Sequence, residues 1–435
     1  MIRALLATCF ALIAFPAAAI DIEEVTSPSG IKAWLVKETS IPFTALEIRF
    51  KGGASLDEQG KRGAAYLMSG LLDEGAGDLD STAFALAAEE LALQYDFDAY
   101  ADGFSISAQF LSENEDASVE LLRKAINEPR FDQDAVDRVR GQVLSILASE
   151  EEDPNDIASR SFAALAYGDH PYASKLEGTA ESVATLTRED LIASHKSLLT
   201  RDRVFVGAVG DISAQELGVL IDTLLGALPA KGPELPSDAP FLLSGGETVV
   251  PYDTLQSVAL FGHLGIARTD PDFFAAFVMN QVLGSGGFGS RLMDEVREKR
   301  GLTYGVYSYM ALREHANLMM GQVSSTNDNV AEAISVIRDE WQKMSEQGVT
   351  QAELDKAKTY LTGAYPLRFD GNARIANILA AMQFDGLPID YIDGRNAKVE
   401  AVTLEDIQRV AKRMLKPENL HFVVVGQPVG LGGSN

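Results

Sequence analysis

The chain has 435 residues, of which 63 are Asp or Glu and 37 are Lys or Arg, giving a formal net charge of −26. A protein that follows a phosphate backbone needs a basic face, so this charge argues against nucleic acid as a partner. At ~100–200 residues per domain the length predicts two or three domains, and the 46% of hydrophobic residues suffices for real cores.

The first residues are typical of a secretory signal peptide. Arg3 gives a positive start, residues 4–15 form an apolar run too short to span a bilayer, and residues 17–19 are alanines suited to cleavage. We therefore expect a signal peptide over residues 1–19, with an uncleaved anchor as the alternative. Loss of the cation Arg3 takes the charge from −26 to −27, and loss of Cys9 leaves no cysteine. Export without a disulfide fits a bacterial periplasm. No later apolar stretch approaches the ~18 residues of a membrane span, so we expect a soluble mature chain.

Alternating and helical hydrophobic patterns predict a similar series of elements in the two halves of the chain. The predicted strands are residues 44–50, 97–100, 104–110, 257–262, 306–312 and 318–324, and the predicted helices near the front of each half are 63–72 and 273–283. Mixed runs of strands and helices indicate α+β domains with largely antiparallel sheets.

An internal repeat is the strongest sign of how the chain is organised. Residues 187–210 and 403–426 match without a gap at an offset of 216 residues. Each copy opens with Thr and, three positions later, Asp, which is a capping-box pattern, and then runs through a helix into an apolar strand that ends in Gly. A period of half the chain indicates a duplicated domain. We expect two homologous domains, residues 20–228 and 245–435, facing each other across a cleft and joined by a Pro-rich linker at 229–244.

The sequence contains no complete metal site. The five histidines are at least 24 residues apart, so no helix can present two imidazoles on one face. We expect His195 and His421, which lie in the repeated helix and strand, to have structural roles.

A glycine-rich stretch at residues 284–289 matches the pattern G-x-G-x-x-G. A dinucleotide site needs a strand before this pattern, whereas a helical pattern precedes it here. We therefore expect a loop between two helices, the second over residues 290–300 with Ser290 as its N-cap. The glycines would still let a peptide backbone approach closely.

Nucleophile motifs are missing too. There is no G-x-S-x-G, and the chain without its signal peptide has no Cys. The acidic run at 150–153 is read as a solvated helix end before Pro154.

Residues 284–309, GSGGFGSRLMDEVREKRGLTYGVYSY, closely resemble the C-terminal half of the M16 family of peptidases, which includes pitrilysin, insulinase and the mitochondrial processing peptidases. Other segments also match the family, in the same order along the chain, and together they cover nearly the whole chain that follows the signal peptide. The resemblance implies two M16 domains.

In the family, the N-terminal domain carries the zinc motif H-x-x-E-H on a helix. Here Tyr66 and Gly70 stand at the positions of the two zinc histidines, and Ser69 replaces the glutamate that activates water. A third ligand is expected around residues 143–147, and residues 138–149 contain no acid. The resemblance therefore implies no metal and no cofactor in this chain.

In the same family, an Arg and a Tyr seven residues apart in the C-terminal domain hold the substrate backbone and stabilise the reacting carbonyl. Arg297 and Tyr304 have this spacing, which makes them the predicted catalytic residues. The predicted substrate-binding residues are those of the glycine-rich loop: Gly284, Gly286, Gly287 and Phe288.

The resemblance implies the non-zinc subunit of a heterodimeric bacterial M16 peptidase, with zinc in the partner and a peptide or unfolded protein as substrate. One alternative is a catalytically silent peptide-binding or scaffold protein of the same fold. A weaker alternative is an independent hydrolase with an unrelated mechanism.

Overall fold

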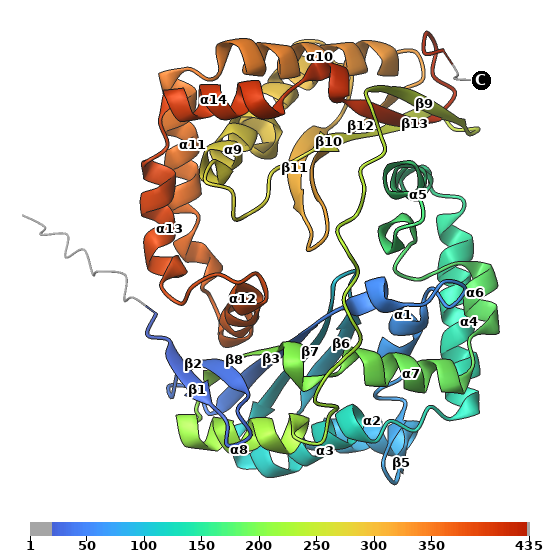
Figure 1. Ribbon diagram of the computed structural model, residues 1–435, viewed down its shortest axis with the longest axis vertical. Coiled ribbons are helices and arrows are strands. Elements are labelled where there is room, and N and C mark those ends of the chain that lie inside the picture. The colour runs from blue at the N-terminus through green and yellow to red at the C-terminus, as the bar shows by residue number, and fades with distance from the viewer. Residues whose placement is uncertain (1–19, 433–435) are drawn as a thin grey trace, which may run out of the picture.

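The computed structural model describes residues 20–432 and contains two large sheets, one in each half of the chain (Figure 1). The predicted signal peptide, with Arg3 and Cys9, lies outside the described residues. The first sheet has the order β1-β2-β8-β3-β7-β6, and the second has the order β11-β12-β10-β13-β9. Their strands are β1 (Glu23–Thr26), β2 (Lys32–Lys37), β3 (Phe43–Lys51), β6 (Gln94–Ala99), β7 (Gly103–Leu111), β8 (Val204–Gly210), β9 (Gly246–Pro251), β10 (Gln256–Leu264), β11 (Val306–Leu312), β12 (Asn317–Thr326) and β13 (His421–Gly426). A separate two-stranded ribbon joins β4 (Gly75–Ala76) and β5 (Leu79–Asp80).

Both sheets are antiparallel except for one pair each, β2 with β8 and β9 with β13. In the first sheet Ile48 of β3 pairs with Ile106 of β7 on one side and Val206 of β8 on the other, and all three side chains are buried. In the second sheet β10 lies between β12 and β13 in the same way. The predicted α+β class, with two similar and mainly antiparallel units, is confirmed.

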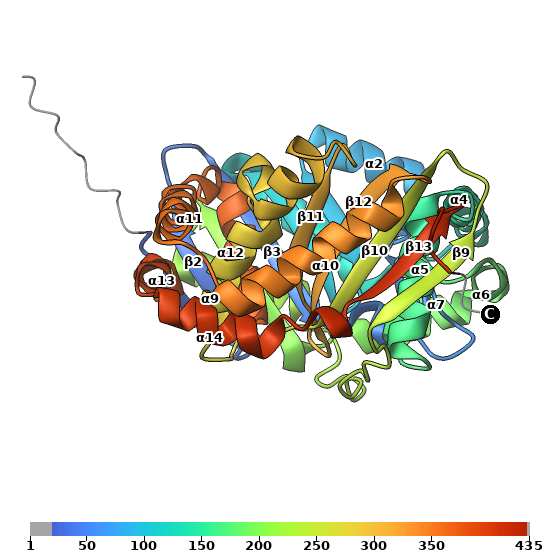
Figure 2. The ribbon, with the colours of Figure 1, turned by 90° about the horizontal axis from the view of Figure 1, so that it is seen from above.

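Helices cover the outer face of each sheet, and Figure 2 shows α10 and α14 lying over the second sheet. The helices of the first half are α1 (Ala64–Ser69), α2 (Ser81–Glu90), α3 (Glu115–Asn127), α4 (Gln133–Glu150), α5 (Pro154–Tyr167), α6 (Ala180–Thr185), α7 (Arg188–Leu198) and α8 (Ala214–Leu225). Those of the second half are α9 (Phe273–Asn280), α10 (Val330–Gln347), α11 (Gln351–Gly363), α12 (Asn372–Phe384), α13 (Tyr391–Glu400) and α14 (Leu404–Met414). No helix between residues 20 and 432 combines the length and apolarity needed to cross a bilayer.

The repeat predicted from the sequence is visible in the starts of two helices. Thr187 and Asp190 form a reciprocal capping box at the start of α7, and Thr403 and Asp406 form the same box at the start of α14. Each helix then leads into a central strand, β8 or β13. The local sequence therefore determines these two segments in the way that the pattern predicts.

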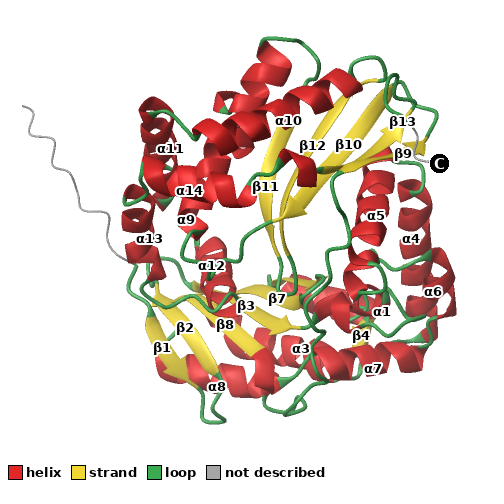
Figure 3. Cartoon of the chain, turned by 45° about the horizontal axis from the view of Figure 1, so that its top comes forward, coloured by secondary structure: helices red, strands yellow, loops and turns green. Residues whose placement is uncertain are grey.

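One helix of each half packs on the inner face of the other half's sheet (Figure 3). Helix α5 of the first half buries Phe162 against Leu260 and Val423 of the second sheet. Helix α12 of the second half buries Leu379 in one cluster with Val209 of the first sheet. Each half therefore has a core of its own, and two further clusters join the halves.

Polar contacts also join the halves where the β11–β12 turn meets the β6–β7 turn. The hydroxyl of Tyr172 donates to Oδ2 of Asp102 at 2.6 Å, and the backbone N–H of His315 donates to that hydroxyl at 3.1 Å. Lys51 pairs with Glu314 at 2.8 Å. The predicted linker, residues 229–244, lies between α8 and β9 and contains no helix or strand.

Candidate functional site

Helix α1, which is expected to correspond to the zinc helix, begins at a buried carboxylate. Asp57 accepts hydrogen bonds from the backbone N–H groups of Gly63 at 2.9 Å and Ala65 at 3.0 Å, which are free because a helix start leaves them without partners. Burial raises the pKa of Asp57 to about 7. Gly63 has φ +92°, and a Cβ there would lie 2.4 Å from the carbonyl oxygen of Glu177. The start of this helix therefore accepts only glycine at position 63.

The three positions that replace the zinc motif lie together at α1 but do not form a ligand set. Ser69 is buried, and its hydroxyl donates to the carbonyl of Tyr66 at 2.8 Å within the same turn. A Cβ at Gly70 would lie 3.3 Å from Val139 of α4. The region expected to hold the third ligand is part of α4, and its buried side chains there are Val143 and Leu147.

The groups around Tyr66 are acidic, and they make its hydroxyl harder to ionise. Burial is the main cause of the raised pKa of Tyr66, and the charges of Glu177, Glu150 and Asp98 add to it. Glu150 is paired with Lys175 at 2.5 Å. In the part of the chain that the structure describes, no three His, Cys, Asp or Glu residues gather as a metal site.

The histidines predicted to be structural have backbone and side-chain partners. His195 is buried, and its Nε2 lies 2.8 Å from the carbonyl of Ile126. His421 lies 2.9 Å from the carbonyl of Ser244 and 3.0 Å from the hydroxyl of Thr248. Both predictions are confirmed.

The glycine-rich loop of the second half is flanked by two π-helical turns. After α9 the chain forms one π turn at Gln281–Ser285 and another at Met293–Glu298. The sequence predicts ordinary helix over 273–283 and 290–300, and this detail is wrong because the extra residue of a π turn leaves no periodic signal. Such turns occur often at functional sites. Ser290 caps the second segment as predicted, accepting from the backbone of Met293 at 3.5 Å.

Arg297 lies in the second π turn and contacts the glycine-rich loop. Its guanidinium lies 4.7 Å from the centre of the Phe288 ring, which is a cation–π contact. It also pairs with Glu298 at 3.0 Å. The structure therefore brings together a predicted catalytic residue and a predicted substrate-binding residue.

Tyr304 projects from a bend just before β11 and is 88% exposed. The neighbouring Thr303 is buried, and its hydroxyl lies 2.6 Å from the carbonyl of Ser324 while accepting from the N–H of Gly305 at 3.0 Å. These bonds fix the backbone on both sides of Tyr304. Tyr307 and Tyr309 continue an exposed aromatic row along β11, with ring centres 6.1 Å apart.

The three predicted loop glycines differ in their surroundings. Gly284 is buried, and a Cβ there would lie 2.1 Å from the hydroxyl oxygen of Ser308, so packing alone accounts for a glycine. A Cβ at Gly286 would lie 2.5 Å from the carbonyl of Gln281. Gly287, with φ +57°, has open space around it, and the adjacent Phe288 is 74% exposed. Contact of this loop with a peptide stays a prediction.

Comparison with known proteins identifies the family. The model of the insulinase family, peptidase family M16, matches residues 33–180, and the model of the peptidase M16 inactive domain matches residues 185–361. The chain belongs to the M16 family. Tyr66, Ser69 and Gly70 lie within the residues matched by the insulinase-family model, and their correspondence to the zinc motif stays a prediction.

Other M16 proteins resemble the chain over nearly its whole length. A crystal structure of the peptidase M16 inactive domain from Pseudomonas fluorescens is 29% identical, with a TM-score of 0.88 over 95% of this chain and 100% of that one. The non-peptidase homolog YmxG of Helicobacter pylori is 28% identical over 391 residues, which are 88% of this chain and 89% of that one. A Mycobacterium tuberculosis protein named as an uncharacterized zinc protease is 26% identical over 92% of both chains.

Proposed function

We propose that this M16 chain is the non-zinc subunit of a heterodimeric metallopeptidase. In this proposal Arg297 and Tyr304 complete the site of a second M16 chain that carries H-x-x-E-H and its zinc, and the substrate is a peptide or an unfolded segment. The chain alone would not hydrolyse peptides.

The observation that carries the proposal is the presentation of Tyr304. A tyrosine that is 88% exposed contributes nothing to the core, yet its backbone is fixed on both sides by the buried hydroxyl of Thr303. Within residues 20–432 its hydroxyl has no hydrogen-bond partner. A donor with a fixed backbone and no partner in its own chain suits a role in the site of another molecule.

The chemistry divides between the two chains. The zinc of the partner would polarise the scissile carbonyl and lower the pKa of its bound water. The hydroxyl of Tyr304 and the guanidinium of Arg297 would donate to the oxygen that becomes negative. The ring of Phe288 lies 4.7 Å from that guanidinium, and a guanidinium has five N–H donors, so its pairing with Glu298 leaves others for a carbonyl oxygen.

The proposal includes export to a bacterial periplasm after removal of residues 1–19. Mass spectrometry of the protein recovered from a periplasmic fraction tests this point, since the mature chain would begin at Ile20.

The central experiment mixes the purified chain with a zinc-bearing M16 protein encoded nearby and measures cleavage of a fluorogenic peptide. We expect activity only in the mixture, and a fall in kcat of about 10²–10³ for Tyr304→Phe, as for the loss of one oxyanion donor elsewhere. Arg297→Ala should lower kcat at least as much. Full activity of the pair with either variant would disprove the catalytic role.

Matched controls separate this role from a general effect on the fold. Tyr360→Phe removes a hydroxyl from another exposed tyrosine, and Arg374→Ala removes an exposed guanidinium. Both should leave kcat unchanged.

A catalytically silent M16 protein is the second candidate, because one relative is named a non-peptidase homolog and another is described as an inactive domain. It predicts that the chain binds peptides or partners but that no mixture gains activity. In that case Tyr304→Phe would change nothing.

A further inference from the structure

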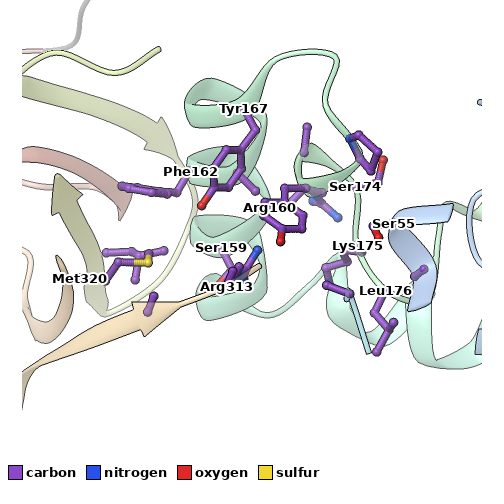
Figure 4. A pocket seen from close by; sticks show the side chains of 18 of the residues that line it. Ser55, Ser159, Arg160, Phe162, Tyr167, Ser174, Lys175, Leu176, Arg313 and Met320 are labelled. Atoms are coloured by element: carbon purple, nitrogen blue, oxygen red, sulfur yellow. The ribbon is translucent and has the colours of Figure 1, made fainter. Parts of the chain in front are cut away.

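A cavity of about 280 Å³ lies where the two halves meet, between α5 and the second sheet. Figure 4 shows its walls, and side chains from both halves contribute to them. Apolar side chains make up much of the lining, and three cations stand among them, which is notable in so acidic a chain: Arg160, Lys175 and Arg313. Serine and tyrosine hydroxyls also line the cavity.

Lys175 is neutralised by its own neighbours. Its ammonium lies 2.5 Å from Glu150 and 3.3 Å from Asp156. Asp156 is four residues before Arg160 on α5, which is the spacing at which an acid commonly pairs with a base on a helix. Because Lys175 binds Asp156, Arg160 has no ion pair among the described residues.

Arg313 also lacks an acidic partner in the described part of the chain, and it is held in place by an aromatic ring. Its guanidinium lies 5.1 Å from the centre of the Tyr172 ring. The nearby acids have other partners, since Glu314 pairs with Lys51 and Asp102 accepts from Tyr172. The ring contact orients the guanidinium and leaves the N–H groups at its edge available.

We propose that this cavity binds a carboxylate of the peptide substrate, between Arg160 and Arg313. Arginine presents a planar fork that matches a carboxylate, and such charge-assisted bonds are stronger than neutral ones. The hydroxyls of Ser159 and Ser174 provide further donors at the wall. The carboxylate is either an Asp or Glu side chain or the C-terminus. The inference rests on the proposed function for its substrate, but the binding itself requires no zinc partner.

The position of the cavity along β11 limits its distance from Tyr304. Tyr309 lines the cavity and lies five residues after Tyr304. At ~3.3 Å per strand residue, the edge of the cavity at Tyr309 lies at most roughly 17 Å along the chain from Tyr304.

The test measures binding of three fluorescein-labelled nonapeptides to the full mature chain by fluorescence anisotropy. One has a single Glu and an amidated C-terminus, the second has Gln in its place, and the third is the Gln peptide with a free carboxylate. We expect the second to bind about tenfold more weakly than the first or the third, and whichever binds tightly identifies the source of the carboxylate. Equal binding of all three would overturn the proposal.

Variants then locate the site. Arg160→Gln and Arg313→Gln should each weaken the tight complex about tenfold, whereas Arg374→Gln, which lines neither this cavity nor its neighbour beside α12, should not. An equal loss in the Arg374 variant would overturn the proposal. With the wild-type chain, raising the NaCl concentration should weaken the binding only of those peptides that carry a carboxylate.

The two proposals can fail separately. Selective binding with no cleavage in any mixture would refute the heterodimeric peptidase and leave the cavity intact. Cleavage by the pair with equal binding of all three peptides would refute the cavity alone.

Discussion

The two halves share one plan, a central strand followed by a loop and a helix, but they differ at the helix that follows that strand. In the first half α1 packs against α4, so that Gly70 faces Val139 and the hydroxyl of Ser69 bonds within its own turn. In the second half α9 leads into two π turns and an exposed loop, and Tyr304 stands clear of the fold. At the predicted zinc-motif positions the first half is closed by packing, whereas the second half exposes Tyr304 and Phe288.

This difference shows how to separate a lost site from a retained one. Where chemistry has gone, packing and internal hydrogen bonds take its place, because a buried polar group without a partner is costly. Where exposed groups stay rigid without such partners, another molecule is needed to account for them.

The largest expected effect on stability concerns the helices exchanged between the halves. Phe162→Ala on α5 and Leu379→Ala on α12 each remove a buried side chain from the opposite half's sheet, so we expect losses of about 3–5 and 2–5 kcal/mol in the free energy of unfolding. Urea denaturation measures both. Leu165→Ala, on the exposed side of α5, is the control and should cost less than about 0.5 kcal/mol. If Phe162→Ala cost no more than this control, the exchange would not hold the halves together.

A smaller effect distinguishes the two glycine-containing segments. Gly63→Ala puts a Cβ 2.4 Å from a backbone oxygen at φ +92°, so we expect a loss of more than about 2 kcal/mol. Gly287→Ala meets nothing within 4 Å and should cost only about 1 kcal/mol, the cost of its φ of +57°. Thermal unfolding of both variants provides the comparison. Equal losses would contradict the view that the first segment is closed and the second is open.

A third difference is a pH dependence of opposite sign in the two halves. Burial raises the pKa of Asp57 to about 7, so the folded state holds its proton longer than the unfolded one and stability falls as pH rises from about 4 to 7. Burial lowers the pKa of His263 to about 4, so stability rises with pH from about 4 to 6.5. Urea unfolding at pH 5 and pH 7 should show that Asp57→Asn gains stability relative to wild type as pH rises. His263→Gln should lose stability relative to wild type as pH rises from 4.5 to 6.5. A pH-independent difference for either variant would contradict its pKa.

The sequence predicted those features that depend on short segments. The capping boxes at Thr187 and Thr403, the strands and the duplication follow from local patterns, and all three are present. The membership of the M16 family followed from the segment around Arg297 and Tyr304. The contact between Arg297 and Phe288 was not foreseen, because it depends on π turns that add a residue without changing the hydrophobic pattern.

Long-range features could not be read from the sequence. Nothing in the pattern of α5 tells on which sheet its Phe162 packs, since a buried face is the same for either partner. Similarly, Asp57 looks like an ordinary loop acid until Gly63 and Ala65 are brought to it. The unpaired state of Arg160 depends on Lys175, which is distant in sequence and binds the acid that helical spacing assigns to Arg160.

The exchange of α5 and α12 between the halves determines what a deletion of one half would do to the other. Because each half supplies part of the cover for the other half's sheet, deleting the half without zinc ligands would strip α5 from the half that carries Arg297 and Tyr304. The first half is therefore needed as structural support for the half that exposes Tyr304 and Phe288, whatever residues stand at its predicted zinc-motif positions.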